Sequence, residues 1–201
     1  MNKKNTRKEQ ILRTATDIFS RFGIKKSTMD EIAQKIRMGK STLYHYFKNK
    51  EEIFLAVVKK EEETLKKRLT EAVQNAMTPQ EQFRNYAKER MKCLNELSNY
   101  YATLTDAYLD IYSFSGDVRK DFEDFELTTL QKIFQEGKNA GIFDIPNSHL
   151  VARMVFVVFK GFEYLYFQKE ITSDTEKEIA RQIEREIDNF IDMFYRGLER
   201  R

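Results

Sequence analysis

Within residues 40–50, two apolar side chains are flanked by polar side chains that can donate hydrogen bonds. Leu43 and Phe47 are four residues apart, so a helix would place both on one face and turn the polar residues outward or sideways. Lysine, serine and threonine can reach base edges or phosphates, and tyrosine hydroxyls donate well to phosphates. We therefore predict contacts with DNA for Lys40, Ser41, Thr42, Tyr44, His45, Tyr46, Lys48 and Lys50.

Two preceding helices are predicted to position this segment. A capping box, Thr28 followed by Glu31, opens a short helix over about 29–36, and a three-residue turn at 37–39 leads into the helix over about 40–47. Two short helices joined by such a turn form a helix-turn-helix when a third helix braces them. That brace is predicted over about 7–22, ends before Gly23, and has an inward stripe of Ile11, Leu12, Ala15, Ile18, Phe19 and Phe22.

The charge of the chain is concentrated at this end. Residues 1–50 hold 13 Lys/Arg and 4 Asp/Glu, a net charge of +9, whereas the remaining residues hold 22 Lys/Arg and 28 Asp/Glu, a net charge of −6. A basic block on a near-neutral chain indicates a polyanionic partner. The alternative is a solvated terminal arm, but the charges lie within a well-patterned helical region.

The whole chain is predicted to be all-α. It has only two prolines and seven glycines, and its apolar residues recur at spacings of three and four. After the first three helices we expect six more, nine in total, over about 50–76, 79–97, 100–113, 117–139, 147–170 and 174–199. The predicted domains are a helix-turn-helix domain at 1–48 and a C-terminal helical domain for ligand binding and dimerisation at 49–201.

Four motifs lie in register within residues 11–55: Ile11-Leu12 with Ala15, Phe19 and Gly23; Thr28-Met29 with Ile32-Ala33; Thr42-Leu43-Tyr44 with Tyr46-Phe47; and Lys50-Glu51. On these motifs the segment resembles the DNA-binding domain of the TetR family of regulators. The resemblance implies a homodimer of all-helical chains whose divergent C-terminal domain binds a small ligand. Where the family usually has a turn glycine and a capping serine, this chain has Arg37 and Gly39. Thr28 and Arg37 join the predicted DNA contacts.

The last two predicted helices carry the expected dimer interface. The final helix has an apolar seam, and the helix before it is apolar almost all round. We expect them to form a four-helix bundle with their copies in a second subunit. The alternative is a core within one chain and a monomer. The predicted interface residues are Val151, Val155, Val158, Phe162, Ile183, Ile187, Phe190, Ile191 and Phe194.

The second half of the chain is rich in aromatic residues, which favours an apolar pocket for a small apolar or aromatic ligand. Core packing is the alternative for each residue taken alone. Arg90, Arg153 and Lys160 are either partners for an anionic end of the ligand or, as we favour, surface charges. The predicted pocket residues are Tyr101, Tyr108, Tyr112, Phe125, Phe134 and Phe159.

Several classes of function are not supported by the sequence. Cys93 is the only cysteine, and the two histidines, His45 and His149, are far apart, so we expect no enzyme, metal site or cofactor. No apolar stretch approaches the roughly 18 residues of a membrane helix, and the start has no signal-peptide core, so a cytoplasmic protein is expected. The prediction is a ligand-responsive repressor that binds a (pseudo)palindromic operator as a homodimer. The alternative is a DNA-binding adaptor or structural protein without an effector.

Overall fold

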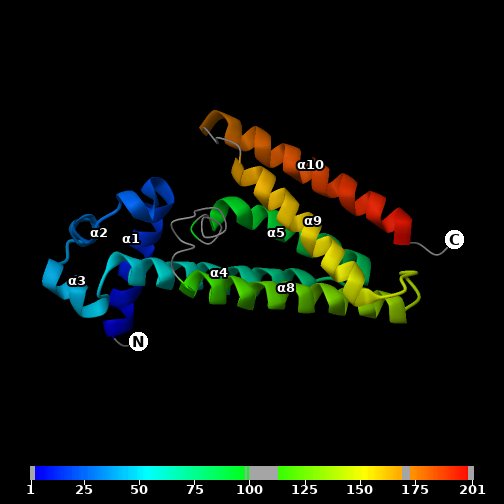
Figure 1. Ribbon diagram of the computed structural model, residues 1–201, viewed down its shortest axis with the longest axis horizontal. Helices are drawn as coiled ribbons and strands as arrows, with labels where there is room; N and C mark the ends of the chain where they lie inside the picture. Colours follow the sequence, from blue (N-terminus) through cyan, green and yellow to red (C-terminus); the bar gives the residue numbers. More distant parts are fainter. Residues whose placement is uncertain (1–2, 98, 100–112, 169–172, 199–201) are drawn as a thin grey trace. The chain divides into compact units, whose positions relative to one another are not determined.

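The structure, a computed structural model of the 201-residue chain, describes residues 3–97, 99, 113–168 and 173–198. These residues form eight helices and no strand (Figure 1). The predicted all-α class is therefore confirmed. The predicted helix over 100–113 lies almost entirely outside the described residues, which accounts for the difference from the expected nine.

The first three helices are α1 (Lys3–Lys26), α2 (Met29–Lys35) and α3 (Lys40–Tyr46). They pack around a small apolar core, because each places its periodic apolar residues on one face. All but one of the predicted inward residues are buried there. The buried set is Ile11, Leu12, Ala15, Ile18, Phe19, Ile32, Ala33, Ile36, Leu43 and Phe47.

Phe22 was predicted to belong to the inward stripe of α1, and this is wrong, since its side chain is 59% exposed. The reason is the backbone at Gly23, where φ is 71° and ψ is 161°. This region is essentially open only to glycine, and it interrupts the regular helix. Beyond the break it is Ile24 that is buried. The helix also begins earlier than predicted, at Lys3 rather than Arg7.

The remaining helices agree with the predicted ranges to within a few residues. They are α4 (Lys50–Gln74), α5 (Pro79–Glu96), α8 (Ser113–Asn139), α9 (Ser148–Gln168) and α10 (Ser173–Leu198). The chain divides into two compact units: an N-terminal unit of 1–64 with 97–118, and a C-terminal unit of 65–96 with 119–201. The units thus divide within α4, whereas the predicted domains divide at residue 48.

Aromatic rings form the core of the C-terminal unit. Phe83 of α5 lies 5.2 Å from Phe134 of α8 and 5.4 Å from Phe194 of α10, measured between ring centroids. Helices α9 and α10 run side by side (Figure 1), with Phe159 and Phe190 in contact between them. Large rings packed in tilted and edge-on pairs bury a large apolar area per residue and stabilise such a core.

Candidate functional site

The start of α2 is fixed by the capping box that the sequence predicts. The Thr28 hydroxyl oxygen accepts a hydrogen bond from the Glu31 amide at 3.2 Å, and the Thr28 amide donates to the Glu31 carboxylate at 2.8 Å. Thr28, a predicted DNA contact, therefore also sets where the first helix of the motif begins.

The end of α2 is a Schellman motif with an arginine where glycine is usual. The Arg37 amide donates to the Gln34 carbonyl at 3.0 Å, and the Met38 amide donates to the Ala33 carbonyl at 2.9 Å. Arg37 has a φ of 52°, a left-handed conformation that disfavours a side chain. The turn that separates the two helices thus has the left-handed conformation that glycine usually adopts, with an arginine in that position.

Replacing this arginine is expected to stabilise the chain slightly. The left-handed conformation costs a non-glycine residue about 1–2 kcal/mol, whereas glycine loses about 0.5–1 kcal/mol through its freedom in the unfolded chain. We expect Arg37→Gly to raise the free energy of unfolding by less than about 1 kcal/mol. Urea denaturation measures this, with Arg37→Ala as the control that keeps the strain. Equal stability of the two variants would contradict the explanation.

Helix α3 presents the face that the sequence predicts. Leu43 is fully buried and Phe47 nearly so, and Tyr46 is half-buried at the edge of the face. The other predicted contacts on this helix are exposed, which brings lysine, hydroxyl, phenol and imidazole groups onto one surface. These exposed residues are Lys40, Ser41, Thr42, Tyr44 and His45, and Lys48 just beyond the helix is exposed as well.

Lys40 lies 2.7 Å from the Asp30 carboxylate, at the start of α2. The hydrogen bond to Asp30 and its negative charge raise the pKa of the Lys40 ammonium. Both side chains are more than half exposed, and pairs of this kind contribute little to stability. Lys40 can therefore exchange Asp30 for a phosphate at small cost.

Lys50 has a different environment from the one that its position beside α3 suggested. Its ammonium donates to three backbone carbonyls at the end of α1 and beyond, those of Ile24 at 2.8 Å, Ser27 at 3.1 Å and Lys25 at 3.3 Å. Cations are favoured at the carboxyl ends of helices, where carbonyls lack partners. Lys50 thus ties the start of α4 to the loop between α1 and α2, a contact over more than 20 residues that sequence spacing did not reveal.

The comparisons with known proteins agree with this geometry. Residues 11–57 match the model of bacterial regulatory proteins of the tetR family. The HTH-type transcriptional regulator QacR of Staphylococcus aureus is 26% identical over 203 residues, covering 96% of this chain and 98% of QacR. Residues 11–57 thus carry a DNA-binding domain of the TetR family. The HTH-type transcriptional regulator YhgD of Bacillus subtilis is 42% identical, but over 73 residues that span only 36% of either chain.

The likeness in fold extends over nearly the whole chain. A solved transcriptional regulator from Saccharomonospora viridis, in complex with choline, has a TM-score of 0.79 with this structure. The match covers 98% of this chain and 100% of the other at 15% identity, and likeness at that identity concerns the fold alone.

Three of the nine residues predicted for dimerisation are buried inside the C-terminal unit. Val155, Ile187 and Ile191 are at most 1% exposed, so they pack within their own chain and leave no surface for a partner. The side chain of Ile183 lies outside the described residues. The others are half-buried, namely Val151, Val158, Phe162, Phe190 and Phe194.

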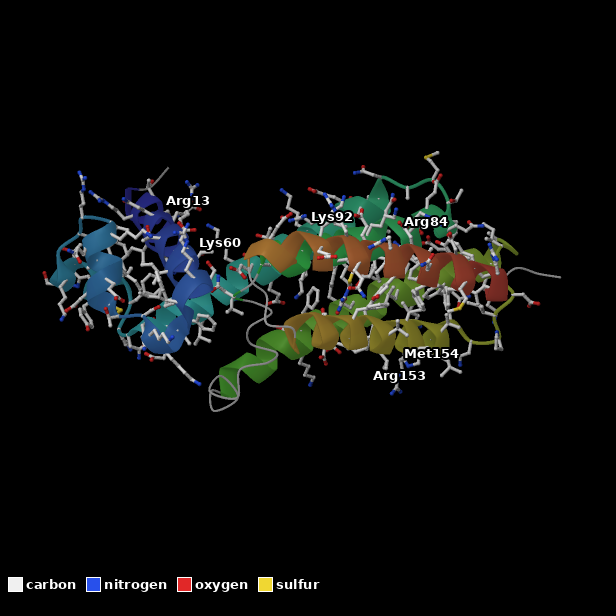
Figure 2. The ribbon with its side chains drawn as sticks, turned by 90° about the horizontal axis from the view of Figure 1, so that it is seen from above. Arg13, Lys60, Arg84, Lys92, Arg153 and Met154 are labelled. Atoms are coloured by element: carbon white, nitrogen blue, oxygen red, sulfur yellow. The ribbon has the colours of Figure 1, made fainter. Side chains whose placement is uncertain are left out.

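A different set of apolar residues is exposed on the same two helices. Leu150, Met154 and Val157 recur at helical spacing along α9 and are 53–66% exposed, and Met193 of α10 is 68% exposed. Figure 2 shows Met154 and its neighbour Arg153 on the outer side of α9. The predicted interface included the inner residues of α9 because this helix is apolar on nearly every face, so its sequence does not indicate which face is exposed.

The predicted pocket residues separate into three groups. Phe134 and Phe159 are fully buried in the aromatic core, and Tyr101, Tyr108 and Tyr112 lie outside the described residues. Phe125 of α8 is half-buried and lines a cavity of about 650 Å³ between α4, the start of α5 and α8. That volume lies within the range of roughly 300–1,000 Å³ of small-molecule sites.

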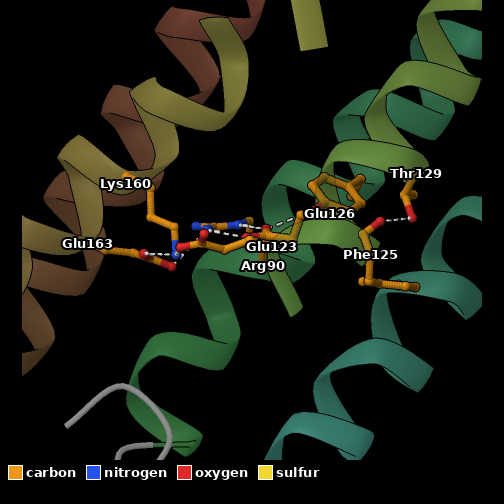
Figure 3. A network of polar contacts seen from close by, with 8 residues as sticks. Arg90, Glu123, Phe125, Glu126, Thr129, Lys160 and Glu163 are labelled. Atoms are coloured by element: carbon orange, nitrogen blue, oxygen red, sulfur yellow. Dashed lines mark hydrogen bonds and ion pairs between the residues drawn. The ribbon is translucent and has the colours of Figure 1, made fainter. Parts of the chain in front are cut away.

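A buried network of charges joins α5, α8 and α9 (Figure 3). Arg90, which we had favoured as a surface charge, is 0% exposed and binds both oxygens of Glu126, while its Nη2 lies 2.7 Å from Glu163. Lys160 lies 3.5 Å from Glu163 and 3.7 Å from Glu123. The sequence analysis missed the three glutamates. Arg153, by contrast, is exposed.

The stability of the chain should depend on pH through Glu163. Burial raises the pKa of this carboxyl above its ordinary value of 4.5, although Arg90 and Lys160 oppose the shift. The folded state then holds the proton to higher pH than the unfolded state, so this group's contribution to stability falls as pH rises above about 4.5. We expect Glu163→Gln to match wild type near pH 4 and to exceed it at pH 7 in urea denaturation. A variant less stable than wild type at pH 7 would contradict this.

Two further observations bear on function. No helix in the described part of the chain is long and apolar enough to span a membrane. Within the same residues, no three His, Cys, Asp or Glu side chains are grouped so that they could hold a metal ion.

Proposed function

We propose that the chain is a ligand-responsive transcriptional repressor that binds a (pseudo)palindromic operator in double-stranded DNA as a homodimer. The observation that carries the proposal is the exposed polar face of α3, held over a buried Leu43 on a segment with a net charge of +9. In a helix-turn-helix the second helix enters the major groove, and surrounding cations neutralise the phosphates. We propose also that a small apolar or aromatic effector releases the protein from the DNA.

A gel shift on the DNA upstream of its own gene, at two salt concentrations, tests DNA binding. We expect specific binding that weakens with salt and is lost in Tyr44→Ala/Lys48→Ala, since both residues lie exposed on or beside α3. Lys92→Ala is the matched control, because it removes an exposed charge from the C-terminal unit. If a genome-wide pull-down found no site, the alternative of an adaptor or structural protein without an effector would be favoured.

The homodimer is proposed to form through the exposed apolar face of α9, with Met193 of α10. An exposed stripe of large apolar side chains is typical of an interface, and a two-fold axis uses the same stripe on both subunits. We expect Met154→Glu/Val157→Glu to be monomeric in size-exclusion chromatography with light scattering. Lys92→Glu, which reverses an exposed charge on α5, should remain a dimer. A dimeric double variant would exclude this face.

The effector is proposed to bind in the C-terminal unit, where Phe125 lines the cavity between α4 and α8. The choline complex of the Saccharomonospora viridis regulator supports a small-molecule site in this fold. An effector that prefers a dimer with the wrong spacing between its two α3 helices releases DNA, since productive spacing is about 34–36 Å or a multiple. By linkage, operator DNA must then weaken effector binding by the same factor. Fluorescence titration measures the affinity for the effector with and without operator DNA. Equal affinities in the two titrations would exclude coupling.

A further inference from the structure

We propose that Asp30 and Lys40 together recognise one G·C base pair in each half-site of the operator. The proposal rests on the proposed function, because it names a base pair that the exposed face of α3 contacts. It is carried by the ion pair that joins the first turn of α2 to the first residue of α3, within the N-terminal unit.

The ion pair places a hydrogen-bond donor beside an acceptor at the start of α3. The Lys40 ammonium lies 2.7 Å from Oδ1 and 2.9 Å from Oδ2 of Asp30. In a helix-turn-helix, the residues at the start of the second helix meet the base edges in the major groove. More than half of each side chain is exposed, so both charged groups remain accessible to a base pair.

Capping of α2 does not account for the carboxylate of Asp30. The capping box uses Glu31, whose Oε2 accepts a hydrogen bond from the Thr28 amide at 2.8 Å. A negative charge in the first turn favours a helix, but Glu31 already supplies one. On a surface that binds DNA, the phosphates repel a carboxylate, so Asp30 lowers the affinity for DNA unless a base donates a hydrogen bond to it.

A G·C base pair is complementary to this donor and acceptor. In the major groove guanine presents two acceptors, N7 and O6, and cytosine presents its N4 amino group as a donor. The Lys40 ammonium can donate to N7 and O6 while the Asp30 carboxylate accepts from N4. An A·T pair is a poorer match, because it offers one acceptor and one donor on adenine and then places the O4 acceptor of thymine near the carboxylate.

The same ion pair disfavours DNA that lacks this base pair. There Lys40 can leave Asp30 for a phosphate, since the pair is exposed and contributes little to stability. The carboxylate of Asp30 is then without its cation and close to the phosphates, which repel it. Specificity therefore increases through the contacts with the right base pair and through repulsion at the wrong ones.

Selection of binding sites from a random-sequence DNA library with the full chain tests the proposal. We expect wild type to enrich a (pseudo)palindrome with one G·C pair in each half-site that is preferred about tenfold over A·T. In Asp30→Ala and in Lys40→Met this preference should fall to about threefold or less, while the preferences at other positions remain. Asp17→Ala removes an exposed carboxylate of α1 and is the matched control, which should keep every preference.

Three results for Asp30→Ala would each overturn the proposal. If every base preference were lost, the ion pair would only position α3. If affinity rose equally for all sequences, Asp30 would only compete with DNA for Lys40. If all preferences were unaltered, neither base of the pair would contact Asp30.

Modified bases in gel shifts on the selected operator assign the atoms. N4-methylcytosine carries a methyl group on the major-groove side of N4, so it should weaken binding by wild type about tenfold and leave Asp30→Ala unchanged. 7-Deazaguanine lacks the N7 acceptor, so it should weaken wild type and leave Lys40→Met unchanged. If a modified base weakened wild type and its variant equally, the contact with that atom would be excluded.

The selection also distinguishes failure of this proposal from failure of the proposed function. A wild-type chain that enriches a palindrome whose preferences do not depend on Asp30 remains a sequence-specific regulator, and only the contact of the ion pair with a G·C pair is wrong. A wild-type chain that enriches no sequence contradicts the proposed function as well.

Discussion

Replacing Arg90 with methionine is expected to lower the free energy of unfolding by about 3–5 kcal/mol, the usual cost of removing one partner from a buried ion pair. The guanidinium compensates the carboxylate of Glu126 and, together with Lys160, that of Glu163, and these two glutamates are 0% and 3% exposed. It also lies over the ring of Phe159, 5.0 Å from the centroid. Methionine fills much of the volume but leaves two buried carboxylates without their arginine.

Urea denaturation of the full chain measures this loss, and Arg84→Met on the same helix is the matched control. Arg84 pairs with Asp188 and Asp192 near the surface, so its loss should cost about 1 kcal/mol or less. The triple variant Arg90→Met/Glu126→Gln/Glu163→Gln removes the charges together and should recover most of the stability. If the triple variant were as unstable as Arg90→Met, lost packing rather than uncompensated charge would be the cause.

The spacing of core residues in the sequence does contain a signal for this network. Arg90 follows Phe83 by seven residues and Ala87 by three, so helical periodicity places it on the buried face of α5. Glu126 lies between Phe122 and Leu130 in the same way. A charged residue at a position that periodicity assigns to the core indicates a buried ionic contact. Which charges meet could not be predicted, because the partners are 36 or more residues apart.

Local patterns predicted the helix-turn-helix well for a physical reason. Its caps and turns are set by interactions within about five residues, such as Thr28 with Glu31 and Met38 with Ala33. Which face of α9 is buried, by contrast, does not depend on interactions within a few residues. Val155 and Val157 are equally apolar, and only packing against other helices determines that the first is 1% and the second 66% exposed. A helix that is apolar on every face therefore predicts contacts on several sides, but its sequence does not indicate which side is buried within the chain.

Replacing Lys50 with methionine is expected to weaken both folding and DNA binding, for one structural reason. The ammonium donates to the carbonyls of Ile24, Lys25 and Ser27, and a hydrogen bond to a charged group contributes roughly 1.5–3 kcal/mol. Because the side chain is only half-buried, we expect a loss of about 1.5–2 kcal/mol in urea denaturation. The loop before α2 then loses its anchor to α4, so α2 and α3 are held less firmly.

The salt dependence of DNA binding distinguishes this positioning role from a direct phosphate contact. Losing a phosphate contact lowers the slope of log K against log salt by about 1, whereas losing a positioning contact leaves the slope unchanged and lowers affinity at every salt concentration. Lys48→Met is the matched control, since its exposed side chain should alter the slope but not the stability. A reduced slope with unaltered stability in Lys50→Met would instead place its ammonium on the DNA backbone. In that case the carbonyl contacts would not be what holds the start of α4.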